Sequence, residues 1–209
     1  MDPDQVRSSY DAVADAYVER FFDELSHKPF DCDLLDKFAV GLPGTSVLDV
    51  GCGPGHVGRY LSERGLQVTG FDLSPAMIKQ ARRLNPSMTF EVADMRRLPV
   101  RDGTCAGIVA FYSIIHIPRA DVPAVLAEFL RVLQPDGGLL VAVHGGSGTV
   151  SRDEFLGQAV PFAATLFEKD ELVRLMGTAG FVIESATVRD PYEFESQTPR
   201  LYVAASTPR

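Results

Sequence analysis

A glycine-rich turn directly follows a short apolar run, and no other feature constrains this 209-residue chain as strongly. The segment from Val47 to Gly58 reads VLDVGCGPGHVG. An apolar run that leads straight into glycines is typical of a buried parallel strand followed by a tight turn. Without Cβ atoms, the backbone can turn sharply and present bare N–H groups to a ligand where the next helix begins. The turn therefore predicts an α/β fold with a ligand site beside it.

After this turn, apolar runs alternate with amphipathic stretches, as βαβ units require. We expect five strands in this part of the chain, at 47–50, 66–71, 88–93, 107–113 and 139–144. Two more strands, 181–188 and 201–206, are separated by a loop too short for a crossover helix, so they should pair antiparallel. The pattern predicts a doubly wound, Rossmann-like α/β fold. Its seven-stranded sheet should be mostly parallel, with an antiparallel last strand and helices on both faces.

The length fits one domain, since domains commonly contain on the order of 150 residues. Within 1–209 we expect an N-terminal helical cover, a cofactor-binding core, a lid-like insertion, and a closing helix and hairpin. These parts correspond to 1–44, 45–144, 145–169 and 170–209. The chain has no apolar run near the ~20 residues that span a bilayer, which predicts a cytoplasmic protein that does not use a membrane.

The charge balance disfavours nucleic acid as a partner. The chain has 20 Lys and Arg against 28 Asp and Glu, a formal net charge of −8. Nucleic-acid binders usually carry a basic stripe, whereas this chain has only the basic pairs 82–83 and 96–97, which we interpret as solvated ends of elements. The three cysteines are far apart, which fits reduced thiols and predicts no metal site.

Three successive expected strands each end in an acid, at Asp49, Asp72 and Asp94. Because parallel strands end at one rim, the three carboxylates should face one crevice. Asp72 lies where a carboxylate accepts hydrogen bonds from ribose hydroxyls. Asp49 would repel a pyrophosphate and favour a cationic group. Gly53, Gly55 and Gly58 also satisfy the G-x-G-x-x-G pattern, so an NAD(P)-dependent oxidoreductase remains an alternative.

In four segments the chain resembles the class I S-adenosylmethionine-dependent methyltransferases, particularly the small single-domain group. The segments are VLDVGCGPG, GFDLSPAMIKQAR, ADM and EFLRVLQPDGGLLVAV, and the resemblance covers nearly all of 46–144. It implies that the cofactor is S-adenosyl-L-methionine and the product S-adenosyl-L-homocysteine. The acceptor would be a small molecule that takes the methyl group on O, N or C by in-line displacement.

The resemblance also implies which residues contact the cofactor. Asp49, Gly51, Gly53 and Gly55 would hold its methionyl part, and Asp72 would bind both ribose hydroxyls. The adenine would pack on Leu73 and Met77 and meet Asp94 and the Met95 backbone. A tyrosine of the N-terminal helix would reach the carboxylate. The full set of expected cofactor-binding residues is Tyr10, Tyr17, Asp49, Gly51, Cys52, Gly53, Gly55, Asp72, Leu73, Met77, Asp94, Met95 and Phe111.

Two histidines follow strands at the same rim and are candidates for a general base. His116 comes after the fourth strand and is the better candidate, and His144 ends the fifth. A base is needed only if the acceptor carries a proton of high pKa. Phe111-Tyr112-Ser113-Ile114 replaces the Asn/Asp-Pro-Pro-aromatic motif of the amide- and nucleobase-methylating members, which disfavours that branch. A non-catalytic cofactor-binding module remains a further alternative, and the sequence leaves monomer or homodimer open.

Overall fold

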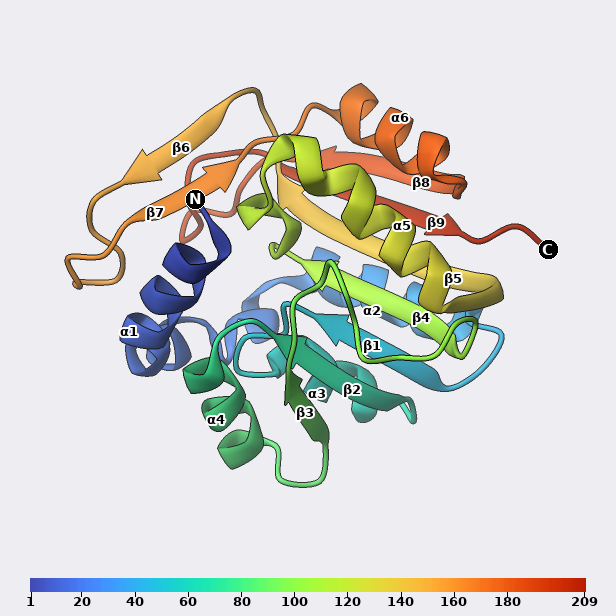
Figure 1. Cartoon of the computed structure of the whole chain (residues 1–209), viewed down its shortest axis with the longest axis horizontal. Helices are drawn as coiled ribbons and strands as arrows, with labels where there is room; N and C mark the ends of the chain where they lie inside the picture. The colour runs from blue at the N-terminus through green and yellow to red at the C-terminus, as the bar shows by residue number, and fades with distance from the viewer.

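The sheet confirms the predicted fold class. The computed structural model describes residues 1–209, and its seven-stranded sheet has the order β3-β2-β1-β4-β5-β9-β8 (Figure 1). The strands are β1 (Ser46–Val50), β2 (Gln67–Asp72), β3 (Thr89–Val92), β4 (Cys105–Phe111), β5 (Leu133–His144), β8 (Val182–Arg189) and β9 (Arg200–Ser206). Neighbours from β3 to β5 pair parallel, and β9 is antiparallel to both β5 and β8.

Helices cover both faces of the sheet. They are α1 (Pro3–Phe21), α2 (Pro29–Gly41), α3 (His56–Ser62), α4 (Pro75–Leu84), α5 (Val122–Val132) and α6 (Lys169–Ala179). Three short 3-10 turns complete the set: η1 (Glu24–His27), η2 (Ile114–His116) and η3 (Arg119–Asp121). The Ser-Pro start of α4 acts as its sequence predicts, because the Ser74 side chain accepts a hydrogen bond from the Met77 amide.

Alternation along β1 divides the core into two layers. Val47 packs in a cluster with Leu61 of α3, on one face of the sheet. Leu48 and Val50 pack in the larger cluster with Phe129 of α5, on the opposite face. Successive strand residues point to opposite faces, so a strand that is apolar throughout must be covered on both sides. This arrangement leaves the carboxyl ends of the strands as the open rim.

The insertion 145–169 contains two strands that the sequence analysis did not assign. β6 (Thr149–Arg152) and β7 (Phe162–Thr165) pair antiparallel and form a separate two-stranded sheet. Figure 1 shows this hairpin next to the start of α1, and the Ser9 hydroxyl of α1 donates a hydrogen bond to the Pro161 carbonyl at 2.8 Å. The hairpin and α1 therefore lie together near the rim.

None of the helices combines the length and the apolar character needed to cross a bilayer.

Candidate active site

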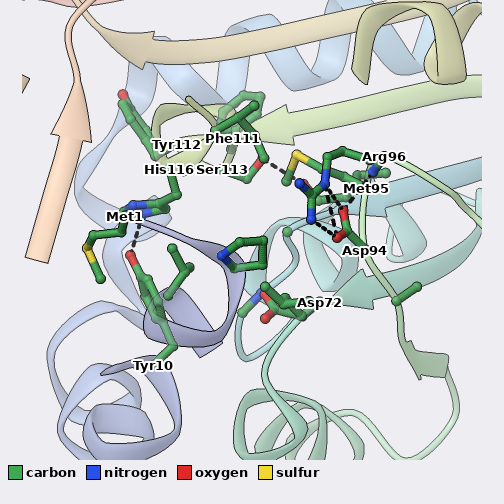
Figure 2. A pocket seen from close by; sticks show the side chains of 18 of the residues that line it. Met1, Tyr10, Asp72, Asp94, Met95, Arg96, Phe111, Tyr112, Ser113 and His116 are labelled. Carbon is green, nitrogen blue, oxygen red and sulfur yellow. Dashed lines mark hydrogen bonds and ion pairs between the residues drawn. The ribbon is translucent and has the colours of Figure 1, made fainter. Parts of the chain in front are cut away.

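A cavity opens at the carboxyl ends of β1, β2 and β4 and beside the loop after β3, with α1 across it (Figure 2). The structure brings together ten of the residues that the sequence analysis predicted for the site. They are Tyr10, Tyr17, Gly51, Gly53, Asp72, Leu73, Asp94, Met95, Phe111 and His116. Several lining residues were not predicted, among them Arg96, Tyr112 and Ser113.

The glycine turn forms the floor of the cavity by close contact with the chain after β4. The amides of Gly51 and Cys52 both donate to the Phe71 carbonyl, at 2.7 and 2.9 Å. Gly51 has φ +74°, and a Cβ there would lie 2.2 Å from the Ser113 Cβ. Glycine is therefore required at this position by both conformation and space. Because the turn carries no side chain at Gly51, its backbone forms an open cradle at the rim of the sheet.

Asp72 ends β2 and reaches into the cavity. Its Oδ2 accepts from the Gly53 amide and its Oδ1 from the Ser74 amide, both at 2.8 Å. Burial raises the pKa of this carboxyl, while the backbone amides oppose the shift. An ionised carboxylate has about four acceptor positions, so two remain for donors in the cavity. This capacity matches two vicinal hydroxyls.

Asp94 follows β3 and forms an ion pair with Arg96. From the sequence we interpreted Arg96 as a solvated residue, but it lines the cavity. The Arg96 Nε lies 3.0 and 3.1 Å from the two carboxylate oxygens of Asp94 (Figure 2). Burial raises the pKa of Asp94, but the hydrogen bonds and the charge of Arg96 outweigh it, so the net pKa is lowered. The lining thus holds an ionised, oriented acceptor beside the apolar surface of Met95 and Ala93.

Tyr10 and His116 form a hydrogen-bonded pair at the opposite side of the cavity. The His116 Nδ1 lies 2.9 Å from the Ala163 carbonyl, which can only accept, so Nδ1 carries the hydrogen. Nε2 is then an acceptor and receives the Tyr10 hydroxyl at 2.7 Å (Figure 2). Burial lowers the pKa of His116 to about 4 and raises that of Tyr10. Both groups are neutral near pH 7.

Aromatic rings of the hairpin and of α1 surround this pair. Phe155 and Phe162 lie 4.6 Å apart between ring centroids, and each packs edge-on to a member of the pair. Tyr17 packs edge-on to Tyr10 at 5.9 Å. The α1 helix and the β6–β7 hairpin therefore form one aromatic cluster, in which the rings of Tyr10 and Tyr17 line the cavity and those of the hairpin pack behind them.

Four predicted cofactor residues lie behind the lining rather than in it. Asp49 is buried, and its Oδ2 accepts from the Gly58 amide in the first turn of α3 at 2.9 Å. Cys52 packs with Ile78 of α4, and Met77 is fully buried on α4. Gly55, with φ +81°, brings the backbone against the Phe90 ring. These residues support the glycine turn and the adjoining helices.

His144 also lies outside the lining. Its Nδ1 is 2.8 Å from the Thr198 hydroxyl, and its ring packs against Tyr112 at 5.2 Å. Burial lowers its pKa to about 4, reinforced by the charge of Arg200. Tyr112 separates His144 from the cavity, so of the two candidate bases only His116 faces it.

Tyr112 joins the cavity to a buried polar network that the sequence analysis missed. Its backbone has φ +51°, which is unusual for a residue with a side chain. Its hydroxyl lies 3.1 Å from the Tyr202 hydroxyl, which in turn donates to Asp31. The only sequence signal was its position near the end of the expected fourth strand, 107–113. No group of three or more His, Cys, Asp or Glu side chains is arranged to hold a metal ion.

Comparison with known proteins identifies the family. Residues 47–137 match the family described as methyltransferase domain. A demethylmenaquinone methyltransferase of Renibacterium salmoninarum is 31% identical over 173 residues, 78% of this chain and 70% of that enzyme. A malonyl-[acyl-carrier protein] O-methyltransferase of Serratia marcescens is 38% identical over 98 residues, 47% of this chain and 38% of that enzyme. The chain therefore belongs to the class I S-adenosylmethionine-dependent methyltransferases.

The fold is shared with solved methyltransferase structures. The 1,6-didemethyltoxoflavin-N1-methyltransferase of Burkholderia thailandensis, solved with bound 1,6-didemethyltoxoflavin and S-adenosylhomocysteine, matches with a TM-score of 0.76 and 22% identity. The match covers 99% of this chain and 88% of that enzyme. The matching segments span only about a third to a half of several curated relatives, the Serratia enzyme among them.

Proposed function

We propose that this chain transfers a methyl group from S-adenosyl-L-methionine to a small-molecule acceptor. The observation that carries the proposal is Asp72, which ends β2, lines the cavity beside the cradle of Gly51 and Gly53, and keeps acceptor capacity beyond its two backbone donors. Family membership and the named activities of the relatives support it. The bound cofactor would supply an electrophilic methyl group on a positively charged sulfur.

The residues present fit this cofactor in both shape and chemistry. Asp72 would accept from the two ribose hydroxyls, and the apolar side chains of Leu73 and Met95 would pack on the adenine. The Asp94 carboxylate would accept from the adenine amino group in place of one of its hydrogen bonds from Arg96. The carboxylates near the cavity would also favour a cationic ligand over a pyrophosphate. Asp49, Cys52, Gly55 and Met77 would act by supporting the turn and α4.

On the acceptor side the wall is aromatic and apolar, formed by Val6, Phe111, Tyr112 and Ile117. Such a wall excludes water and suits an apolar or aromatic acceptor, which must lie in line with the methyl group. His116 would act as the base through Tyr10. The Tyr10 oxygen accepts the acceptor's proton while its own proton passes to Nε2 of His116. Because burial lowers the pKa of His116 to about 4, the proton would pass to it only as the methyl group transfers, when the acceptor's proton becomes strongly acidic; a phenol or an enol fits this sequence of events.

The test is an acceptor screen with S-adenosyl-L-methionine, in which released S-adenosyl-L-homocysteine is measured. We expect turnover with at least one phenolic or enolic acceptor. His116→Ala should then lower kcat by about 10²–10⁴, the range for loss of a general base. Tyr10→Phe should lower kcat comparably, and the exposed His27→Ala is the matched control.

Unchanged turnover in His116→Ala would discard His116 as the base. Absence of turnover with every acceptor, despite cofactor binding, would favour the non-catalytic module. Oxidation or reduction of an acceptor with NAD(P) would favour the oxidoreductase.

A further inference from the structure

Three consecutive residues of α1 attach this helix to three different parts of the molecule. Ser9 donates to the Pro161 carbonyl next to β7, and Tyr10 pairs with His116 of η2. Asp11 contacts the beginning of α4. The first two contacts reach the acceptor side of the cavity, whereas the third reaches the segment that directly follows Asp72.

The Asp11 carboxylate accepts two hydrogen bonds at the N-terminus of α4. Its Oδ1 lies 2.6 Å from the Ser74 hydroxyl and 3.0 Å from the Ala76 amide. The Ser74 hydroxyl already accepts from the Met77 amide at 3.1 Å, so its own hydrogen is directed at Asp11. A carboxylate is favoured at a helix N-terminus, where amides of the first turn lack partners. Asp11 thus completes a cap that Ser74 alone leaves open.

The same serine connects Asp11 to the cavity. Its amide donates to the Asp72 Oδ1 at 2.8 Å, and the Asp72 Oδ2 accepts from the Gly53 amide at 2.8 Å. A continuous series of hydrogen bonds therefore runs from α1 through Ser74 and Asp72 to the glycine turn. Gln80 of α4 also donates to Asp15 one turn further along α1, so the two helices are held together at two points.

We propose that Asp11 is a positioning residue for the cofactor site. It fixes Ser74, and through Ser74 the orientation of the Asp72 carboxylate, while it holds α1 with Tyr10 and Tyr17 across the cavity. Occupancy of the ribose position and the placement of α1 are therefore coupled, so that a ligand held by Asp72 also stabilises the helix that covers it. This role rests on the proposed function, because the ligand of Asp72 is the cofactor ribose.

The experiment compares wild type, Asp11→Ala, Asp11→Asn and the exposed α1 control Glu19→Ala. S-adenosyl-L-homocysteine binding is measured by calorimetry, and hydrogen exchange of residues 3–21 is measured with and without that ligand. Asp11→Ala should bind about tenfold more weakly, exchange α1 amides faster without ligand, and lose the ligand-induced protection of α1. Asp11→Asn keeps an acceptor oxygen and should bind within about threefold of wild type. Glu19→Ala should match wild type in both measurements.

Two results would overturn the proposal. One is an Asp11→Ala variant that binds and protects α1 as wild type does. The other is a variant that binds weakly but exchanges α1 amides as wild type does, because Asp11 would then act on the loop alone. Failure of folded wild type to bind S-adenosyl-L-homocysteine would count against the proposed function instead. Circular dichroism and the Asp11→Asn variant separate loss of the contact from loss of the fold.

Discussion

His116 shows how burial sets the chemistry of a single side chain. Its imidazole has one hydrogen-bond partner on each nitrogen, the Ala163 carbonyl and the Tyr10 hydroxyl. Burial lowers its pKa to about 4, so the neutral ring is favoured in the folded protein. The same contacts that fix the tautomer also join η2 to β7 and α1. The contacts that would serve proton transfer by His116 therefore also stabilise the fold.

The pKa of His116 predicts a pH dependence of stability. The folded pKa of about 4 lies below the ordinary value of 6.5, so between these pH values the unfolded chain binds more protons at this position. Stability that depends on neutral His116 is complete above pH 6.5 and is lost as the pH falls to 4. At ~1.4 kcal/mol per pKa unit, we expect a loss of about 3 kcal/mol.

The measurement is the free energy of unfolding by urea from pH 7 to pH 4, in wild type and in His116→Gln. The difference between the two proteins should shrink as the pH falls. Asp49, whose pKa burial raises to about 7, has the opposite pH dependence, but it is present in both proteins and cancels. The exposed His27→Gln is the control. A difference that stays constant across this range would contradict the assignment of a neutral, buried His116.

Residue types and strand ends predicted much of the site. The ten predicted residues that line the cavity lie at strand ends or in the segments that directly follow them, in the glycine turn, or on α1. Asp11, Arg96 and Tyr112 were missed because their roles depend on contacts across the fold. Asp11 and Asp15 both face α4, and nothing in the sequence separates Asp11 from the other acids of α1. Arg96 follows Asp94 by two positions, a spacing that common loops also show.

At the scale of elements, the β1–α3 turn packs so closely against the segment between β4 and η2 that each limits the side chains the other can carry. A Cβ at Gly51 would lie 2.2 Å from the Ser113 Cβ, and the Ser113 hydroxyl donates to the Val50 carbonyl at 2.7 Å. The two segments are far apart in sequence, but together they form the floor of the cavity. Their close approach is therefore part of the site.

Gly51→Ala should lower the free energy of unfolding by about 2–3 kcal/mol, from its positive φ and the contact with Ser113. Ser113→Gly removes the opposing Cβ, so Gly51→Ala should cost less in that background, with a coupling of about 1 kcal/mol or more. A double-mutant cycle by urea unfolding measures the coupling. Gly53→Ala is the control, since its φ is also positive but its Cβ would meet only Tyr17 at 3.7 Å. Additive effects of the Gly51 and Ser113 substitutions would contradict the close contact.

The strands of the main sheet have clear hydrophobic patterns and were predicted, whereas the β6–β7 hairpin has a weak pattern and was not. The apolar strands of 46–144 predicted the parallel part of the sheet, and the short loop before β9 predicted its antiparallel strand. The hairpin was missed because TVSR of β6 is largely exposed and has no apolar alternation. β5 begins at Leu133 rather than near 139 because Leu133 pairs with Cys105 before an irregularity, and regular pairing resumes at Gly138.

At the scale of the whole molecule, the cavity exists only because distant segments meet at one rim. The N-terminal helix, the ends of β1, β2 and β4, and the loop after β3 all contribute to the lining. The hairpin reaches this site through Phe155 and Phe162, which pack against Tyr10 and His116. The excess of acidic residues, which first disfavoured nucleic acid, includes two carboxylates at this cavity, Asp72 and Asp94. The fold thus places negative charge where a cationic cofactor would bind.

The most direct measurement is a calorimetric titration of S-adenosyl-L-homocysteine into wild type and Asp72→Ala, with the exposed Asp33→Ala as the control. A hydrogen bond to a charged group contributes about 1.5–3 kcal/mol, so loss of the Asp72 carboxylate should weaken binding at least tenfold. We predict that wild type and Asp33→Ala bind alike, that Asp72→Ala binds at least tenfold more weakly, and that NADH does not bind. Equal affinity of Asp72→Ala and wild type, or binding of NADH in place of S-adenosyl-L-homocysteine, would contradict the proposed cofactor site.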